Sequence, residues 1–244
     1  SAAFFGHPAS KLKTIGITGT KGKTTATYMV KSILENAGIK TGLIGTIETI
    51  IGDKHTPASN TTPESYVVQQ SFKEMVDAGI ECVVMEVSSQ GLMLNRVAGF
   101  TFDYGIFTNL SPDHIGPNEH KDFDDYLHCK AKLFKQCKVG IFNGDSEYYN
   151  DMVRDADCEI LTFGEGEGHD YNASDVKLTN NAGVLGVSYM LGGRLSGEVN
   201  VPVPGDFSVY NSLTAIAICD CFDVAFSKIA DALLNVSVKG RVEL

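Results

Sequence analysis

The sequence predicts an α/β domain with a mainly parallel sheet, helices on both faces and a small antiparallel β patch. Short apolar segments alternate with helical ones as far as Gly164, and this alternation is typical of a parallel sheet covered on both sides. The turn-rich link GEGEGHD then ends the alternation. Residues 171–202 carry short strands separated by Asn-Asn-Ala-Gly and Gly-Gly turns, which favour an antiparallel patch.

The expected elements follow from hydrophobic periodicity and from the positions of glycine and proline. The expected strands span 13–18, 41–50, 81–87, 102–110, 138–143 and 159–164, followed by three short strands within 171–202. The expected helices span 23–37, 63–78, 122–134, 206–222 and 226–236, with one further short helix before residue 159.

The composition limits the domain count and the kinds of partner that the protein can bind. The chain has 244 residues, 43% of them hydrophobic, which is enough for a core and corresponds to one large domain with at most a small appendage. The net charge of −10 excludes bulk attraction to nucleic acid or to an anionic membrane, so any bound phosphate must be held by a few local donors. A monomer is expected.

The cysteines and the apolar segments indicate a reducing compartment, the cytoplasm. The six cysteines form no CxxC pair and match no zinc spacing, which favours reduced core thiols. No run of 18 apolar residues could span a membrane, and the start of the chain, SAAFFGHPASKLK, lacks the long apolar region of a signal peptide.

The segment that follows the first expected strand has the pattern of a P-loop. It consists of Gly19, Thr20, Lys21, Gly22, Lys23, Thr24 and Thr25. Glycines let backbone N–H groups surround phosphate oxygens, and the helix that follows adds the partial positive charge of its N-terminus. Lys23 would contact the β- and γ-phosphates of ATP, and Thr24 would ligate Mg²⁺. The alternative, an ordinary glycine-rich turn, would not need Lys-Thr at these positions.

Three further candidates follow later expected strands. Glu86 ends an apolar strand and suits a metal ion beside the P-loop, although a strand-end cap or ion pair is the alternative. Asp113-His114 follows the next strand, where His114 is either structural or part of the same crevice. Lys130 lies on the helix after that, and taken alone it would be a solvated surface lysine.

Together these segments closely resemble the central ATP-binding domain of the Mur ligases. The matching segments are GTKGKTT, Thr61-Thr62-Pro63, MEVSSQGL (85–92), Arg96, TNLSPDH (108–114) and CKAKLF (129–134). Within the family the chain is most similar to the MurE branch. It departs from the family pattern at Gln90, at Ser208, at Lys239 and in the segment HIGPNEH (114–120).

The resemblance implies a role for each matching residue. Lys23 and Thr24 would hold the phosphates of ATP and Mg²⁺, and Glu86 and His114 would form a second metal site. Lys130 would be carbamylated by CO₂, so that its new carboxylate holds Mg²⁺. The residues implied to grip the UDP-sugar peptide are Thr61, Thr62, Ser88 and Arg96. The further residues implied to contact the nucleotide are Asn143, Asp145, Asn211 and Arg241.

The resemblance also implies the reaction and the boundaries. ATP would phosphorylate the terminal carboxylate of a UDP-N-acetylmuramoyl-peptide, and the amine of an amino acid would then displace phosphate, in bacterial peptidoglycan precursor synthesis. Residues 1–12 would be the remnant of a linker from an N-terminal domain, 13–238 the ATPase domain, and 239–244 the hinge to a C-terminal domain. The alternatives are a folylpolyglutamate or cyanophycin synthetase-like ligase, another Mur branch, or a nucleotide-binding module without ligase activity.

Overall fold

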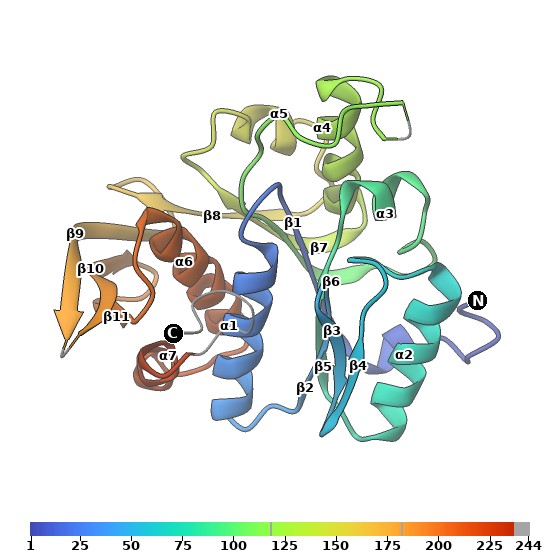
Figure 1. The fold of residues 1–244 in the computed structure, drawn as a ribbon, viewed down its shortest axis with the longest axis horizontal. Helices are drawn as coiled ribbons and strands as arrows, with labels where there is room; N and C mark the ends of the chain where they lie inside the picture. The colour runs from blue at the N-terminus through green and yellow to red at the C-terminus, as the bar shows by residue number, and fades with distance from the viewer. Residues whose placement is uncertain (118, 182, 237–244) are drawn as a thin grey trace.

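The computed structural model describes residues 1–117, 119–181 and 183–236, and within them one eleven-stranded sheet runs through the protein (Figure 1). Its strands are β1 (Lys13–Thr18), β2 (Thr41–Ile44), β3 (Glu48–Ile51), β4 (Lys54–Pro57), β5 (Cys82–Glu86), β6 (Phe102–Phe107), β7 (Cys137–Asn143), β8 (Glu159–Glu165), β9 (Tyr171–Asn181), β10 (Val184–Gly193) and β11 (Gly197–Val201). The helices are η1 (Pro8–Lys11), α1 (Lys23–Asn36), α2 (Ser65–Asp77), α3 (Ser89–Met93), α4 (Phe123–Ala131), η2 (Lys132–Lys135), α5 (Tyr149–Val153), α6 (Asp206–Asp220) and α7 (Phe226–Leu234).

The centre of the sheet is parallel and its two edges are antiparallel. The strand order is β11-β10-β9-β8-β7-β6-β1-β5-β2-β3-β4, with parallel pairing from β9 through to β2. Ile17 of β1 pairs with Glu86 of β5, and Thr18 pairs with Phe107 of β6. The carboxyl ends of these three strands therefore meet at one edge of the sheet, where ligands of open α/β sheets bind.

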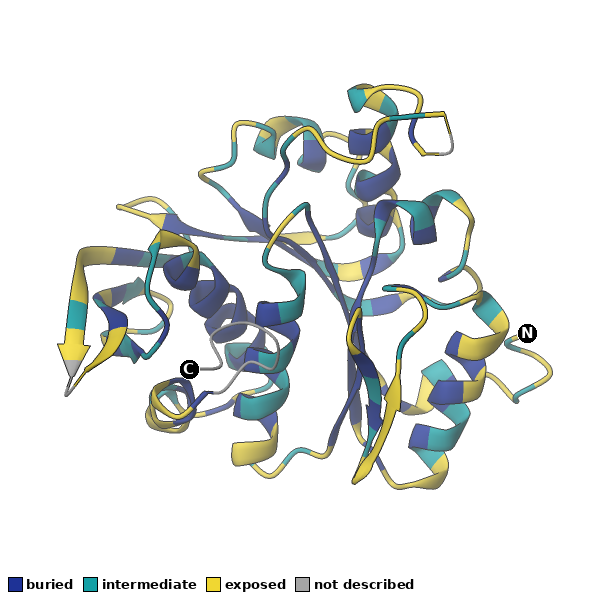
Figure 2. Cartoon of the chain, viewed as in Figure 1, coloured by how far each residue is buried: buried dark blue, intermediate teal, exposed yellow. Residues whose placement is uncertain are grey.

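Two apolar cores lie on opposite faces of the sheet. Helices α1, α6 and α7 bury one cluster, to which they contribute Met29, Leu213 and Ile229. Helices α2, α3, α4 and α5 cover the other face (Figure 1). The strands between them are buried on both sides, as the burial colours show (Figure 2). This arrangement confirms the predicted α/β class.

The antiparallel patch is also confirmed, and it continues the main sheet. β9 pairs in parallel with β8 through Phe163 and Tyr171, and β10 and β11 then add antiparallel strands. None of the helices in the described ranges has the length and apolar character that crossing a bilayer requires.

The prediction of a single strand over 41–50 is wrong. β2 ends at Ile44, the chain turns, and β3 returns antiparallel with Leu43 opposite Ile50. A tertiary contact stabilises the turn, because Thr46 donates its N–H and its hydroxyl to the Glu86 carboxylate, and a side chain at Gly45 would meet that carboxylate at 2.6 Å. The exposed strand β4 and the short helix α3 were not predicted, because β4 has no buried face and α3 spans little more than one turn.

Candidate functional site

The loop between β1 and α1 has the backbone that a P-loop requires. Gly22 precedes the first residue of α1 with φ 85°, in the left-handed region that favours glycine. A side chain at this position would also collide with Asn211 of α6. The N-terminus of α1 therefore faces an open turn with its first N–H groups unpaired within the helix, as the sequence predicts.

Residues after β6 fix the shape of this loop. The backbone N–H of Thr20 donates to the Asn109 carbonyl at 2.9 Å. The side-chain amide of Asn109 exchanges two hydrogen bonds of 2.9 Å with the backbone of Lys21. The Thr20 hydroxyl lies 3.0 Å from the Tyr126 hydroxyl of α4. Sequence reasoning noted TNLSPDH for His114 and missed Asn109, because only the fold brings Asn109 to the loop.

Two lysines converge on one carbonyl of the loop. Lys23 and Lys130 each donate from Nζ to the Gly19 oxygen at 2.9 Å. Lys130 is 1% exposed and lies over the Tyr126 ring at 4.5 Å from its centroid. Burial, and then the charge of Lys23, lower the pKa of Lys130 well below its ordinary value. Lys130 is therefore not the solvated surface lysine of the alternative interpretation.

Glu86 lies buried at the end of β5, in contact with the P-loop helix. Thr24 Oγ1 donates to its carboxylate, 3.1 Å from each oxygen. Thr46, in the turn after β2, adds its N–H at 2.8 Å and its hydroxyl at 3.0 Å. No ion pair to Glu86 is found within the described ranges. A buried carboxylate that neutral donors hold fits a cation, and the oxygens of Thr24 and Glu86 are the ligand type that Mg²⁺ prefers.

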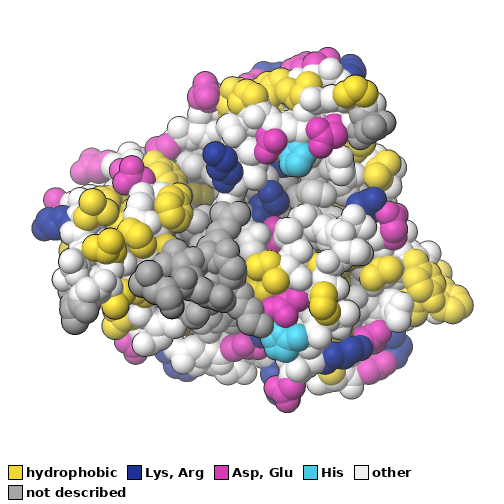
Figure 3. Space-filling view, in the orientation of Figure 1, with side chains coloured by type: hydrophobic (Ala, Val, Ile, Leu, Met, Phe, Trp, Pro, Cys, Tyr) yellow, Lys and Arg dark blue, Asp and Glu magenta, His cyan; other side chains and the backbone are white. Residues whose placement is uncertain are grey.

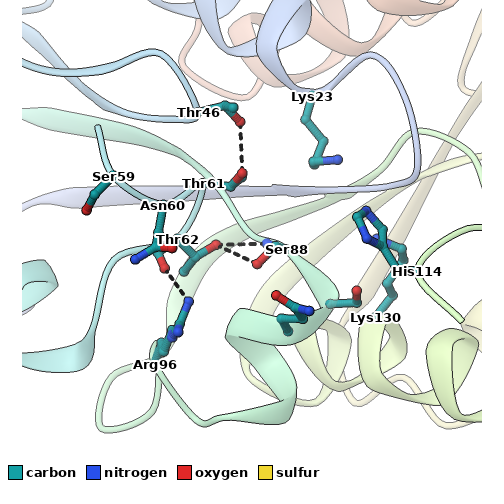
Figure 4. A pocket seen from close by; sticks show the side chains of 12 residues that line it. Lys23, Thr46, Ser59, Asn60, Thr61, Thr62, Ser88, Arg96, His114 and Lys130 are labelled. Carbon is teal, nitrogen blue, oxygen red and sulfur yellow. Dashed lines mark hydrogen bonds between the residues drawn. The ribbon is translucent and has the colours of Figure 1, made fainter. Parts of the chain in front are cut away.

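Thr61, Thr62, Ser88, Arg96, His114 and Lys130 line one cavity of about 290 Å³ together with Lys23 (Figure 4). His114 reaches it from the loop after β6, with its backbone at φ 54° and its side chain half exposed. Its Nδ1 lies 3.0 Å from Glu119 Oε1. Several separate segments thus supply this cavity, which brings Lys23, His114 and Lys130 together as expected, whereas Thr24 and Glu86 are not among the residues that line it.

The four residues predicted to bind the substrate each make contacts within the protein. Thr62 is buried, and its hydroxyl donates to the Glu86 carbonyl at 3.0 Å and accepts from the Ser88 N–H at 2.9 Å. Ser88 Oγ caps α3 by accepting from Gly91 N at 3.0 Å. Both therefore shape the wall of the cavity through contacts within the protein. The Thr61 hydroxyl lies 3.0 Å from the Thr46 hydroxyl. Arg96 donates to the Thr62 carbonyl at 3.1 Å and pairs with Glu64 at 2.6 Å.

A second cavity, of about 380 Å³, adjoins the other part of the P-loop. The predicted nucleotide residues that line it are Lys21, Gly22, Asn143 and Asn211. Phe207 and Tyr210 of α6 also line it. Asp145 lies beside it and accepts a 3.0 Å hydrogen bond from the Tyr210 hydroxyl. Arg241 and the expected hinge 239–244 lie outside the described residues.

Comparison with known proteins identifies the family. Residues 17–219 match the Mur ligase middle domain. The chain belongs to this family. A UDP-N-acetylmuramoyl-L-alanyl-D-glutamate–2,6-diaminopimelate ligase of Clostridium perfringens is 43% identical over 251 residues, which cover 100% of this chain and 50% of that protein. A ligase of the same name, numbered 1, from Clostridium acetobutylicum is 43% identical over 244 residues, with the same coverage.

The Mur ligase fold is confirmed by a solved structure of a protein of the same ligase name. Its TM-score is 0.83 at 25% identity, over 93% of this chain and 47% of that one. The resemblance to the MurE branch is thus confirmed by relatives along the whole chain. The chain spans about half the length of the curated relatives it matches.

Proposed function

We propose that this Mur ligase middle domain is the ATP-binding part of an ADP-forming ligase that adds an amino acid to a UDP-N-acetylmuramoyl-dipeptide. The observation that carries the proposal is the position of the P-loop between two cavities. Lys21 and Gly22 line one of them, and Lys23 lines the other with Lys130 and His114. A nucleotide that enters the first cavity with its phosphates on the loop directs its terminal phosphate toward the second.

The nucleotide is held by local donors. Asn143 and Asn211 would contact its base side, while the backbone of residues 19–25 and Lys23 would contact its phosphates. Acidic side chains are spread over this face, and only a few basic ones lie near its centre (Figure 3). A broad positively charged surface therefore does not contribute to phosphate binding. This favours a nucleotide and a small anionic substrate over nucleic acid as the ligands.

Thr24 would hold Mg²⁺ beside the phosphates of ATP, and Glu86 and His114 would form a second metal site with a carbamylated Lys130. Mg²⁺ supplies charge stabilisation at the transferring phosphoryl group. Lys130 fits carbamylation because its burial beside Lys23 favours the neutral amine. The amine nitrogen would attack CO₂, a C–N bond would form, and the amine would lose a proton to solvent. The resulting carboxylate would place a negative charge near the Lys23 ammonium group, which is electrostatically favourable.

The carboxylate of the dipeptide would enter the cavity lined by Thr61 and Arg96. Its oxygen would attack the terminal phosphorus of ATP, giving an acyl phosphate and ADP, and the amine would then displace phosphate. The chain's own contribution is to orient these groups, since no protein nucleophile is needed. The names of the relatives indicate 2,6-diaminopimelate as the amino acid. The place of this precursor synthesis would be the bacterial cytoplasm.

Nuclear magnetic resonance of the ¹⁵N-labelled 244-residue chain with Mg-ATP tests the substrate class. We expect UDP-N-acetylmuramoyl-L-alanyl-D-glutamate to shift the signals of Thr61, Ser88 and Arg96, because these residues line one cavity. A folyl-glutamate serves as the competing ligand. Equal shifts with the folate, or no shift with the muramoyl dipeptide, would contradict the proposal.

A further inference from the structure

Three side chains with metal-binding atoms meet next to the loop that carries His114. One ring nitrogen of His120, one carboxylate oxygen of Asp125 and the sulfur of Cys129 all lie within 4.8 Å of one another. We propose that His120, Asp125 and Cys129 bind one Zn²⁺ ion, at a site separate from the magnesium residues. The sequence did not reveal this site, because its spacing matches no CxxC or other zinc pattern.

The fold holds the three residues in place before any ion binds. Asp125 and Cys129 are four residues apart on α4, so their side chains lie on one face of that helix. Asp122 caps the helix by accepting from the Asp125 N–H at 2.8 Å. His120 closes the preceding loop by donating its N–H to the His114 carbonyl at 3.0 Å and accepting from Gly116 N at 3.1 Å. Metal binding would therefore cost little additional conformational entropy, because the three side chains are already held in place.

The His120 ring has a nitrogen that the described protein atoms do not satisfy. The ring is fully buried, and its Nδ1 lies 3.1 Å from Asp125 Oδ2. Its Nε2 is buried and has no hydrogen-bond partner within the described ranges. Nδ1 is the nitrogen that faces Asp125, so Nδ1 would bind the ion beside Asp125 Oδ2, and Nε2 lies on the opposite side of the ring.

The donor set selects the kind of ion. Imidazole, carboxylate and thiolate together are ligands of Zn²⁺, whereas Mg²⁺ takes oxygen ligands. The separation of 3.1 Å between His120 Nδ1 and Asp125 Oδ2 is already close to that between two ligands of one ion. Asp125 is 31% exposed, which gives an ion a path from solvent and leaves a coordination position for water. On binding, the Cys129 thiol would lose its proton to the buffer as the S–Zn bond forms.

The ion would join the loop of His114 to the helix of Lys130. His120 is tied to His114 through the backbone, and Cys129 is the neighbour of Lys130 in α4. Both His114 and Lys130 line the main cavity. The zinc would therefore stabilise the relative position of these two segments, in addition to any role that they have in catalysis.

Titration of the 244-residue chain with Co²⁺, which replaces Zn²⁺ and reports its ligands, tests the site. We expect a thiolate-to-cobalt charge-transfer band that saturates at one equivalent and is displaced by Zn²⁺. Only a cysteine gives this band, so binding of Co²⁺ to Glu86 or His114 does not mimic it. Cys129→Ser should abolish the band, whereas Cys158→Ser, at a half-buried cysteine outside the cluster, should retain it.

Asp125→Asn provides a second variant that does not disturb a buried thiol. It should weaken zinc affinity at least about tenfold, as loss of groups at metal sites commonly does. Circular dichroism checks that each variant is folded. Absence of the band from the native chain, a band that survives in Cys129→Ser, or unchanged affinity in Asp125→Asn would each overturn the proposal.

Discussion

The Gly19 carbonyl accepts hydrogen bonds from two lysine side chains, Lys23 and Lys130. Two ammonium groups this close repel each other, and the buried one is the easier to neutralise, since burial disfavours its charged form. Both residues contact the same carbonyl, but the buried position of Lys130 favours its neutral amine. Lys23 is the first residue of helix α1, and Lys130 lies inside the protein.

Lys130→Ala should lower the turnover of a ligase that contains this domain by at least about 10–100-fold, because a metal-supporting group is lost. Lys132→Ala is the matched control, since Lys132 is exposed two residues away. With ¹³CO₂, the native chain should show a carbamate signal that Lys130→Ala lacks. This signal should grow as pH rises through the lowered pKa of Lys130, because only the neutral amine reacts. Full turnover in Lys130→Ala would rule out a metal-supporting role for Lys130.

Lys23→Ala should weaken ATP binding about 10–100-fold, the equivalent of one hydrogen bond to a charged phosphate. Isothermal titration calorimetry with Mg-ATP on the 244-residue chain measures this. Lys31→Ala, on the same helix α1, should leave the affinity unchanged because Lys31 pairs with Glu35 away from the loop. Equal affinities of the native chain and Lys23→Ala would remove the basis of the P-loop assignment.

At the scale of elements, β1, β6 and β7 are tied together by Asp103. Its Oδ2 accepts from the Thr14 N–H of β1 at 2.9 Å, and its Oδ1 accepts from Lys138 Nζ of β7 at 2.8 Å. Burial acts to raise the pKa of Asp103, but the hydrogen bonds from Lys138 and Thr14 outweigh it and hold the pKa below its ordinary value. This group of contacts, here called the Asp103 clamp, lies at the amino ends of the strands, away from the two cavities beside the P-loop.

Asp103→Asn should lower the free energy of unfolding by about 1.5–3 kcal/mol at neutral pH, as loss of hydrogen bonds to a charged group does. A carboxylate with a lowered folded-state pKa stabilises the protein fully above its ordinary pKa, and this contribution is lost as pH falls through the lowered value. Urea unfolding from pH 7 to pH 3 should therefore show the difference between native and variant shrinking. Asp155→Asn, which breaks an exposed pair with Lys135, should change stability by less than about 1 kcal/mol. A difference that does not vary with pH would argue against the clamp.

At the scale of the whole molecule, two cavities flank the P-loop, and the chain matches about half of its relatives' length. The matched half contains the P-loop, Glu86, His114 and Lys130. The other half of the relatives would then hold groups for the incoming amine and for the rest of the UDP-substrate.

The 244-residue chain alone should bind Mg-ATP and form no amide product. Mass spectrometry of reactions with ATP, UDP-N-acetylmuramoyl-L-alanyl-D-glutamate and 2,6-diaminopimelate measures the product. A longer protein of the same family, assayed in parallel, is the positive control. Tripeptide product from the 244-residue chain would mean that this half also binds the amine.

The sequence alone determined the features that are local in the chain. The P-loop, the parallel alternation and the later antiparallel strands depend on periodicity and on glycine at fixed positions, so they were predicted. Lys23, Glu86 and His114 could be placed together because parallel strands direct their carboxyl ends to one edge, whereas Lys130 was added to them by the family resemblance.

Only the tertiary structure decided the contacts between distant segments. The turn after β2 depends on the hydrogen bond from Thr46 to Glu86, which lies forty residues later in the sequence, and the P-loop shape depends on Asn109. The burial of Lys130 depends on the placement of α4 beside the P-loop, and the meeting of His120 with Cys129 depends on how the loop before α4 folds back onto that helix. Such contacts leave no local pattern, because each side chain has an ordinary neighbourhood in sequence and acquires its electrostatic environment only when the chain folds.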